Sequence, residues 1–327
     1  MDSLPKISML LITYNQQRYA LDALKGALSQ DYGNLEIIVS DDCSSDETFH
    51  ILSDFSAEYQ GPHKLVLHRN ERNVGIGENL NTAVSLSSGE LLVVTAGDDI
   101  SLPHRVSVLA KNWLEHGKRP DLLASYLQDL DQSGATHDVI PVTDLSRYQG
   151  VDAWLQGHPT LIGAAQAWTR RLYDEFRGIP SGVVAEDMLM AFRAFSAGGA
   201  LTIPEPLVLY RRGGTTGKRR HLSLDEVKAA FIKKIDNTKI ELLHMIEVAA
   251  RKRASPALLR YFMNLYQKEC LIEIMLRSPI SAKDKLWYWW KAVDLDWGFK
   301  IRILSYGMFP FLFGPFFALK RLVRGAR

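Results

Sequence analysis

The chain has 327 residues, of which 46% are apolar and 10% aromatic, so it can bury a large core and its composition excludes a disordered protein. Its two cysteines, Cys43 and Cys270, are far apart in the sequence, which excludes a disulfide framework and a zinc knuckle and favours a reducing, cytosolic setting. The first residues lack the basic start and long apolar run of a signal peptide, so we expect no export.

Charge is unevenly distributed along the chain. Residues 251–327 hold 15 Lys and Arg against 5 Asp and Glu, a local balance of +10, whereas residues 1–250 hold 24 against 32, a balance of −8. A basic, aromatic tail on an acidic body predicts contact with a negatively charged surface. We favour anionic lipid and expect no nucleic acid; the alternative is a basic helical face exposed to solvent.

Short apolar runs alternate with helical patterns over the first hundred residues. The predicted strands are residues 7–12, 35–39, 64–68 and 91–95, and the predicted helices are residues 18–29 and 78–87. A further helix is expected at a capping box, with Ser44 as the N-cap and Glu47 three residues later. This alternation predicts an α/β fold with a mostly parallel sheet and with ligands at the carboxyl ends of its strands.

Polar clusters directly follow three of these strands. They are Thr13-Tyr14-Asn15, Asp41-Asp42 and Asp98-Asp99. Any one of them could be ordinary turn chemistry. Because the carboxyl ends of parallel strands meet at one edge of a sheet, we expect all three clusters to converge on one crevice.

The rest of the chain is read more coarsely. A helix is expected to start near Ser101, with Pro103 in its first turn, and to run through residues 106–115. Residues 117–157 show scattered β-like pieces and predict mixed structure. The remaining pattern predicts a helix at 185–197, a strand at 201–210, a Gly- and Arg-rich loop at 211–220, and helices from residue 224 and over 256–277.

Five motifs together carry a resemblance to a known family. They are Ile-Thr-Tyr-Asn at 12–15, Glu-Ile-Ile-Val-Ser-Asp-Asp-Cys-Ser at 36–44, Arg-Asn-Val-Gly at 72–75, Gly-Asp-Asp-Ile-Ser-Leu-Pro at 97–103 and Glu-Asp at 186–187. In this order and spacing, the chain resembles the family 2 glycosyltransferases of the GT-A fold over roughly residues 6–220. The resemblance implies a nucleotide-sugar-binding α/β domain, followed here by a C-terminal helical region.

The first motifs would hold the nucleotide of the donor. The resemblance implies that Tyr14 packs on the base or ribose and that Asp41 or Asp42 hydrogen-bonds to them. The other implied nucleotide-binding residues are Thr13, Asn15, Asn73, Gly75 and Asp98. The alternative for Tyr14 is ordinary packing at a strand end.

Asp98 and Asp99 occupy the place of the family's metal-binding motif, which implies Mn²⁺ or Mg²⁺ as cofactor. Such a cation prefers hard oxygen ligands and stabilises the charge of a departing diphosphate. The family often has a further Asp two residues before the acid that corresponds to Asp98, where this chain has Ala96. Asp98 would then be the principal ligand, and Asp99 could instead reach the ribose, a metal-bound water or a structural partner.

Glu186-Asp187 resembles the family's catalytic acidic pair at the start of a helix. An inverting transfer needs a general base for the acceptor hydroxyl, and such assistance contributes ~10²–10⁴-fold to the rate. We assign Asp187 as this base, with Glu186 as its support or alternative. Acids also stabilise helix N-termini without any catalytic role, which is the competing interpretation.

The loop after residue 210 would form a lid over the diphosphate. Arg211, Arg212 and His221 are expected to donate to its oxygens. In the family, a Tyr-Arg pair and a nearby His occur in this region, which would correspond to Tyr210, Arg211 and His221.

The C-terminal tail combines aromatic and basic residues. Residues 286–290 read Leu-Trp-Tyr-Trp-Trp, and an uncharged run at 303–319, broken by Pro310 and Pro315, is short for a membrane span. We expect an interfacial helix pair with Trp at the lipid headgroups and Lys and Arg on anionic lipid. Burial in a core or in a dimer interface is the alternative.

These expectations give a GT-A domain at 1–222, with a nucleotide half at about 1–100 and an acceptor half at about 101–222, and a helical region at 223–327. The predicted enzyme is an inverting glycosyltransferase that uses a UDP, dTDP or GDP sugar. Its acceptor would be a glycan or a polyprenyl-diphosphate-linked sugar in O-antigen or other surface polysaccharide synthesis, at the inner face of the cell membrane. One alternative is a non-catalytic nucleotide-sugar-binding protein, suggested by Ala96. The other is a nucleotidyltransferase, which would need a Gly-rich phosphate loop after the first strand, and residues 13–17 contain no glycine.

Overall fold

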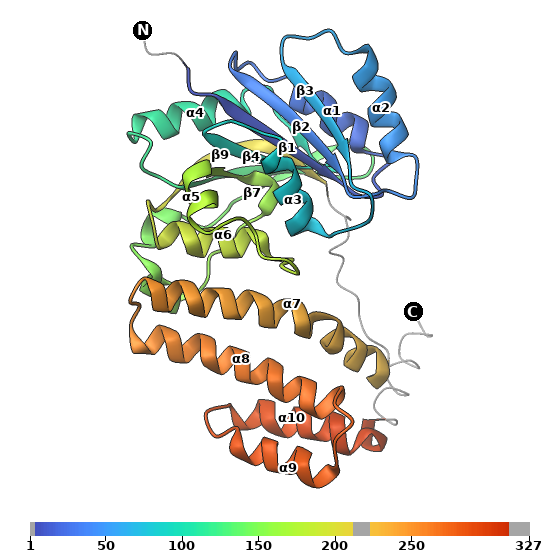
Figure 1. The fold of residues 1–327 in the computed structure, drawn as a ribbon, viewed down its shortest axis with the longest axis vertical. Helices are drawn as coiled ribbons and strands as arrows, with labels where there is room; N and C mark the ends of the chain where they lie inside the picture. Colours follow the sequence, from blue (N-terminus) through green and yellow to red (C-terminus); the bar gives the residue numbers. More distant parts are fainter. Residues whose placement is uncertain (1–3, 212–222, 314–327) are drawn as a thin grey trace. The chain divides into compact units, whose positions relative to one another are not determined.

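The structure is a computed structural model that describes residues 4–211 and 223–313, and the chain divides into two compact units, Met1–Thr216 and Gly217–Arg327. Figure 1 shows a sheet with helices in the first unit and helices alone in the second. The strands of the first unit are β1 (Ile7–Thr13), β2 (Leu35–Asp41), β3 (Lys64–Arg69), β4 (Leu91–Ala96), β5 (Ile100–Ser101), β6 (Leu122–Leu130), β7 (Thr136–Ile140), β8 (Gln166–Thr169) and β9 (Ala200–Arg211). Its helices are α1 (Ala20–Leu28), α2 (Thr48–Glu58), α3 (Ile76–Ser85), α4 (Arg105–Glu115), α5 (Arg170–Glu175) and α6 (Glu186–Phe195), with 3₁₀ segments η1 (Leu145–Arg147), η2 (Val151–Gln156) and η3 (Gly163–Ala165).

All strands of the described residues join one sheet in the order β3-β2-β1-β4-β8-β6-β9-β5, with β7 paired to β6. The four strands β3, β2, β1 and β4 are parallel, and β6 is parallel to β9. The pairs that involve β8, β5 and β7 are antiparallel. The predicted α/β fold with a mostly parallel sheet is therefore confirmed.

Side-chain alternation along β1 explains how the sheet is covered. Ile7, Met9 and Leu11 belong to one buried cluster with residues of α1, α2 and α4. The helix α3 contacts β1 and β2 and lies on the other side of the sheet (Figure 1). The strands β1 and β2 are buried over their whole length, and each has a central apolar run, Met9–Ile12 and Ile37–Val39, as expected for a parallel sheet with two covered faces.

The predicted strands of the first hundred residues agree with β1 to β4 within two residues, but two predicted helix starts were wrong. The capping box does not form, because the Ser44 hydroxyl donates to Asp41 Oδ1 at 2.5 Å and α2 begins only at Thr48. Ser101 does not start a helix either, because residues 100–101 form β5, which pairs with β9. Pro103 precedes α4, which begins at Arg105.

The second unit contains α7 (Leu224–Arg251), α8 (Pro256–Leu276), α9 (Ala282–Lys291), α10 (Trp297–Met308) and the 3₁₀ segment η4 (Pro310–Phe313). Its core contains Ile235, Leu271, Ile272, Met275, Leu295 and Ile303. Four helices begin with a side-chain cap, from Ser223, Ser255, Ser281 and Asp296. None of the helices that the structure describes is long and apolar enough to span a bilayer.

Candidate active site

The carboxyl ends of β1, β2 and β4 meet at one edge of the sheet, which we call the acidic edge. Thr13 pairs in register with Asp41, and Ile12 pairs with Ala96. The turn after β4 is fixed to β1, because the Gly97 amide donates to the Ile12 carbonyl at 2.9 Å. A side chain at Gly97 would collide with Thr13 and Gln16. The structure therefore brings the three predicted polar clusters together.

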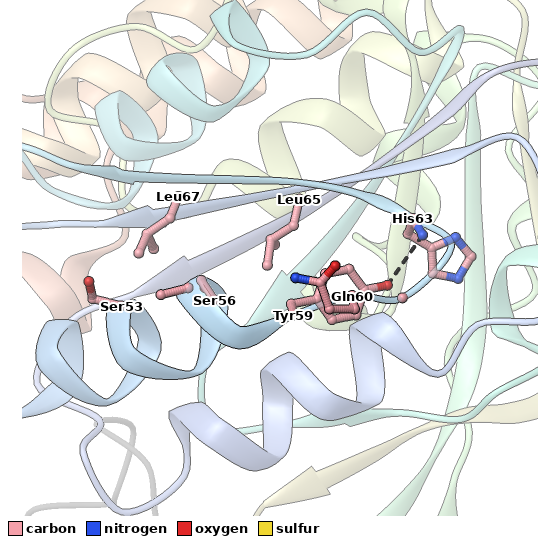
Figure 2. A pocket seen from close by; sticks show the side chains of 9 residues that line it. Ser53, Ser56, Tyr59, Gln60, His63, Leu65 and Leu67 are labelled. Carbon is pink, nitrogen blue, oxygen red and sulfur yellow. Dashed lines mark hydrogen bonds between the residues drawn. The ribbon is translucent and has the colours of Figure 1, made fainter.

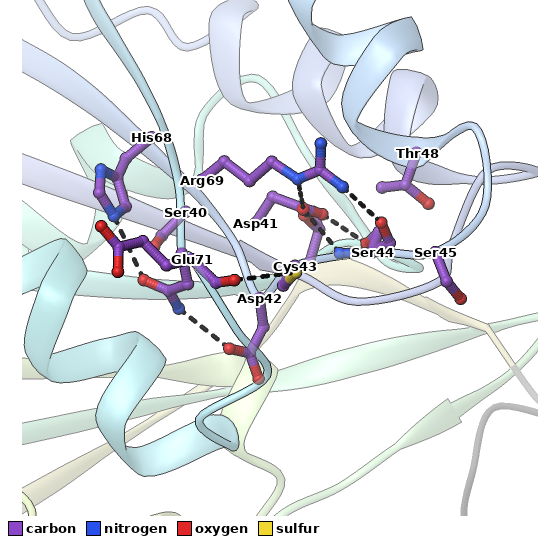
Figure 3. Close-up of polar contacts among 12 residues, drawn as sticks. Ser40, Asp41, Asp42, Cys43, Ser44, Ser45, Thr48, His68, Arg69 and Glu71 are labelled. Atoms are coloured by element: carbon purple, nitrogen blue, oxygen red, sulfur yellow. Dashed lines mark hydrogen bonds and ion pairs between the residues drawn. The ribbon is translucent and has the colours of Figure 1, made fainter.

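Asp41 is fully buried, and its carboxylate holds the turn after β2 (Figure 3). Its oxygens accept from the Thr13 hydroxyl at 3.0 Å and from the amide and hydroxyl of Ser44 at 2.9 and 2.5 Å. Arg69 Nε lies 3.7 Å from Asp41 Oδ2. A carboxylate has about four acceptor positions, so these four contacts occupy Asp41 completely.

Asp42 holds the loop that precedes α3. Its Oδ1 accepts from the Val74 amide at 2.8 Å and from Asn70 Nδ2 at 2.9 Å, and its Oδ2 accepts from the Gly75 amide at 2.9 Å. Gly75 is the N-cap of α3 and has φ of +87°, a conformation that favours glycine. Asn73, between these anchors, is exposed. Three contacts leave Asp42 with about one free acceptor position.

The loop after β1 is also anchored, with one aromatic ring left accessible. The Asn15 amide donates to the Ser44 hydroxyl at 2.9 Å, and its Oδ1 accepts from the Ser45 amide at 2.8 Å. Asn15 has φ of +51°, which Asn tolerates better than most residues. The Tyr14 side chain between these anchors is 47% exposed. Tyr14 therefore offers an aromatic surface at the acidic edge.

The two acids after β4 differ in accessibility. Asp99 is buried, and its Oδ1 accepts from the Arg211 amide at 2.8 Å. Burial, aided by the charge of Asp98, raises the pKa of Asp99 to about 7. Asp98 is only partly buried, and burial raises its pKa as well. Asp98 is thus the acid of this pair that can meet a ligand.

Arg211 supports the turn that carries Asp98 and Asp99. Its Nε donates to the Asp98 carbonyl at 3.1 Å, and its guanidinium carbon lies 4.3 Å from the centroid of the Tyr19 ring. Arg211 is 8% exposed and lies 3.8 Å from Asp22. The other two predicted lid residues, Arg212 and His221, lie outside the described residues.

Arg105, at the start of α4, was not predicted as a site residue. It is fully buried and donates to the hydroxyls of Thr95 and Ser101 at 3.0 and 2.9 Å. Its other terminal nitrogen donates to the carbonyls of Val94 and Ala164 at 2.9 and 2.7 Å. Arg105 therefore ties the end of β4 to η3. In the sequence, Arg105 appears only as an Arg two residues after Pro103. This pattern does not distinguish a buried Arg that links two elements from an exposed Arg at a helix start.

The acidic pair 186–187 begins α6, as predicted. Glu186 is buried, and its carboxylate lies so close to Gly163 in η3 that a Cβ at that glycine would be 2.8 Å from Oε1. Asp187 is half-buried, and its Oδ1 accepts from the Met188 amide at 2.7 Å. Its carbonyl accepts from Gln166 Nε2 at 3.4 Å. The pair thus lies beside the same η3 segment that Arg105 ties to β4.

A second connection links α6 to the acidic edge through α3. The Asn81 side chain donates to the Ile179 carbonyl at 2.8 Å and accepts from the Ile179 amide at 2.9 Å. A side chain at Gly77 would contact the Val183 carbonyl at 3.2 Å. The loop before α6 therefore packs against α3, whose start Asp42 holds. The acidic pair is thus connected to the acidic edge by two routes. One runs from the end of β4, which precedes Asp98, through Arg105 and η3, and the other runs from Asp42 through α3 and the loop before α6.

The described residues contain no group of three or more His, Cys, Asp or Glu side chains able to hold a metal by themselves. Asp98 supplies one accessible hard oxygen ligand, whereas Asp99 has one oxygen occupied by the Arg211 amide. Mg²⁺ is commonly held by one or two carboxylates together with substrate phosphates and water. The residues therefore fit a cation that is bound jointly with a diphosphate.

A separate groove lies between α2 and β3 (Figure 2). It has a volume of about 530 Å³ and is lined by Ser53, Ser56, Ala57, Tyr59, Gln60, Gly61, His63, Leu65 and Leu67. None of these residues contributes to the acidic edge.

Comparison with known sequences is consistent with these motifs. The profile of a family described as "Glycosyl transferase family 2" matches residues 8–174. The putative glycosyltransferase EpsE of Bacillus subtilis is 35% identical over 106 residues, which are 32% of this chain and 37% of EpsE. The putative colanic acid biosynthesis glycosyl transferase WcaA of Escherichia coli is 36% identical over 104 residues, 32% of this chain and 36% of WcaA. The chain thus spans little more than a third of the length of either relative.

Two solved structures share the fold at low sequence identity. S. aureus TarS 1-349 in complex with UDP-GlcNAc aligns with a TM-score of 0.56 at 16% identity, over 91% of this chain and 81% of that one. The mannosyltransferase PcManGT from Pyrobaculum calidifontis, in complex with GDP-Man and Mn²⁺, aligns with a TM-score of 0.54 at 17% identity, over 95% and 87% of the two chains.

Proposed function

The chain belongs to glycosyl transferase family 2 and has the GT-A fold expected from its motifs, and from this membership we propose an inverting transfer of a sugar from a nucleotide diphosphate to a hydroxyl group. The observation that carries the proposal is the convergence of Tyr14, Asp42 and Asp98 at the acidic edge, with Asp187 connected to them through η3 and α3. Strand ends of this kind are where α/β folds bind nucleotides.

The donor nucleotide would lie across the ends of β1 and β2. Tyr14, with its exposed ring, would pack on the base or ribose. Both neighbouring acids are buried. Asp41 acts by fixing the turn, and Asp42, which keeps about one acceptor position, is the one proposed to accept from the base or ribose. Asn73 and Gly75 lie at the N-terminus of α3, where the helix dipole favours an anion such as the diphosphate. Thr13 and Asn15 would shape this site through their contacts with residues 41–45.

Asp98 would hold a divalent cation, Mn²⁺ or Mg²⁺, together with the diphosphate oxygens. When bound, such a cation neutralises the charge that grows on the leaving diphosphate. Asp99, buried and bonded to the Arg211 amide, would keep the turn in place. Arg211 supports the same turn, and Arg212 and His221 are proposed to donate to the diphosphate from the loop that follows.

Asp187 would act as the general base. The acceptor hydroxyl oxygen attacks the anomeric carbon of the donor sugar, and its proton passes to the Asp187 carboxylate. The bond between the anomeric carbon and the diphosphate oxygen breaks, and its electron pair leaves with the diphosphate. Attack on the face opposite the leaving group inverts the anomeric configuration. Glu186 is buried against Gly163, which favours a supporting role for it.

The acceptor is proposed to be a glycan or a polyprenyl-diphosphate-linked sugar of a surface polysaccharide such as O-antigen. The similarity to a putative colanic acid biosynthesis enzyme supports this class. We further propose that the protein works in the cytoplasm at the inner face of the membrane, with peripheral contact through residues 223–327.

A panel of nucleotides tests the donor site. UDP, GDP, dTDP and CDP are added to the protein with and without Mn²⁺, and the thermal unfolding midpoint is recorded. Ligand binding to the folded state raises this midpoint by mass action. We expect one or two nucleotides to raise it, and to raise it further with Mn²⁺. No shift with any nucleotide would reject the proposed donor site.

A non-catalytic nucleotide-sugar-binding protein is the second candidate, because Ala96 replaces an acid of the metal motif. Both candidates predict a thermal shift with nucleotide. Release of the diphosphate from a bound donor sugar, measured with the nucleotide sugar that the panel identifies, occurs only in the enzyme.

A further inference from the structure

The hairpin formed by α9 and α10, residues 282–308, exposes an unusual number of large apolar side chains. Trp287 and Trp290 on α9 are 55% and 67% exposed, and Trp297 and Ile301 on α10 are 57% and 58% exposed. Val293, in the turn between the helices, is 75% exposed. Large apolar side chains that are exposed together on one hairpin indicate a site of contact with a partner or a membrane.

These side chains recur at helical spacing. Trp287 and Trp290 are three residues apart on α9, and Trp297 and Ile301 are four apart on α10, so each pair lies on one face of its helix. The opposite sides of the hairpin are occupied, because Leu295 and Ile303 are buried in the core of the second unit and Trp289 packs against that core. Trp289 Nε1 also donates to the Lys300 carbonyl at 2.8 Å. The exposed residues thus belong to a hairpin whose other side is packed into the core of the second unit.

Lys300 lies between two indole rings of this hairpin. Its Nζ is 4.8 Å from the centroid of the Trp289 ring and 4.7 Å from that of Trp297, and the residue is 2% exposed. Within residues 4–211 and 223–313, no ion pair or side-chain hydrogen bond involves this ammonium. The two rings attract the cation, but a buried charge without a counterion remains costly. Lys300 is therefore part of the packed side of the hairpin and is shielded from ligands in the solvent.

The charge around the hairpin favours an anionic partner. The hairpin itself, residues 282–308, contains five Lys and Arg and three Asp. Asp294 and Asp296 are the only acids between residues 285 and 327, and Asp296 caps α10 by accepting from the Phe299 amide at 2.8 Å. Two copies of this surface would bring like charges together, whereas an anionic bilayer matches both the cations and the Trp residues, which favour the headgroup region.

We propose that the hairpin of α9 and α10 inserts its exposed aromatic side chains into the surface of an anionic phospholipid bilayer, where the exposed Lys291 and Arg302 meet lipid phosphates. The inference deepens the proposed peripheral location and rests on it. It does not depend on the chemistry at the acidic edge.

The test measures binding of the full-length protein to two kinds of vesicle. One contains phosphatidylcholine alone, and the other contains phosphatidylcholine with about 30 mol% of the anionic lipid phosphatidylglycerol. Cosedimentation and tryptophan emission are recorded. We expect binding to the anionic vesicles with a blue shift of the emission, and weakening of that binding by salt. Equal sedimentation with and without vesicles would overturn the proposal.

Three variants separate the contributions. Trp287→Ser with Trp290→Ser should weaken binding to both vesicles by more than about tenfold, because two large apolar groups are lost. Lys291→Gln with Arg302→Gln should weaken binding to the anionic vesicles alone by about fivefold or more, because two exposed cations are lost. The matched control, Leu243→Ser with Met263→Ser, removes two exposed apolar residues of α7 and α8 and should change nothing.

Equal loss in the control, or no loss in the Trp variant, would overturn the proposal. So would a stable dimer in sedimentation velocity without vesicles that the Trp substitutions dissociate. The thermal shift with nucleotide is measured in every variant. An unchanged shift shows that the variants are folded, and it separates a failure of membrane binding from a failure of the proposed enzymatic function.

Discussion

Burial separates the acids that hold the site together from those that can meet a ligand. Asp41, Asp42, Asp99 and Glu186 are buried, whereas Asp98 and Asp187 are only partly so. The sequence identified all of these acids as candidates, but it could not predict this division. Accessibility depends on partners such as Arg211 for Asp99 and Gly163 for Glu186, which are distant in the sequence. Arg105 was missed for the same reason.

Substitution of the proposed base tests the catalytic assignment. Asp187→Asn keeps the size of the side chain but cannot accept the proton, so kcat should fall by about 10²–10⁴-fold. The Kd of the donor nucleotide should stay within about twofold of the wild type. Glu186→Gln should lower kcat less, because Glu186 is proposed to support the site. Unchanged transfer in Asp187→Asn would refute the assignment.

Arg105 gives a prediction about stability. Arg105→Gln leaves the buried carbonyls of Val94 and Ala164 without their donor, so the free energy of unfolding should fall by about 2–4 kcal/mol in urea denaturation. The control Lys111→Met removes an exposed charge 3.9 Å from Glu115 on the same helix and should cost less than about 0.5 kcal/mol. Equal effects of the two substitutions would contradict the role of Arg105.

At the scale of elements, strands were predicted correctly where both faces of the sheet are covered and the strand is therefore rich in apolar residues. The strands β1, β2 and β4 were predicted because each contains a run of at least three apolar residues that is buried. The start of α2 was misplaced because Ser44 bonds to Asp41 instead of capping the helix. Residues 117–157 gave no clear pattern because they form several short elements, β6, β7, η1 and η2, that differ in type. The strand β7 is also exposed, so burial imposes no apolar pattern on it.

Glu36 joins three elements at the edge opposite to the acidic edge. Its Oε1 accepts from the Ser8 hydroxyl at 2.7 Å and from the Ser88 amide at 2.6 Å, and Oε2 lies 2.9 Å from Lys6 Nζ. Although burial alone would raise it, these contacts lower the pKa of Glu36 to about 2, from an ordinary value of 4.5. The ionised carboxylate therefore stabilises the fold above pH 4.5, and this contribution is lost as the pH falls from 4.5 to about 2.

Glu36→Gln should accordingly lower the free energy of unfolding at pH 7 by about 2 kcal/mol. The difference from the wild type should shrink as the pH falls below 4.5, which chemical denaturation at several pH values can measure. Nucleotide binding at pH 7 should not change, because Glu36 lies at the amino end of β2. A difference that persists at pH 2 would show that the carboxylate charge is not the cause.

At the scale of the whole molecule, the sequence predicted the fold class and the family, because both depend on motifs placed at strand ends. The two compact units divide at residue 216, and the proposed domain boundary at 222 falls in the part of the chain that the structure does not describe. The partner of the C-terminal unit could not be predicted from the sequence, because an apolar helix face has the same pattern whether it meets a core or a membrane. The exposure of side chains such as Trp290 and Val293, on which the proposed membrane contact rests, is visible only in the structure.

The central claim is that the acidic edge binds a diphosphate and a divalent cation together. It is tested most directly by calorimetric titration of the preferred nucleotide with and without Mn²⁺, in the wild type, in Asp98→Asn and in the control Asp138→Asn, an exposed acid of β7. Mn²⁺ should tighten nucleotide binding by about tenfold or more in the wild type and the control and have no effect in Asp98→Asn. A full Mn²⁺ effect in Asp98→Asn would contradict the account.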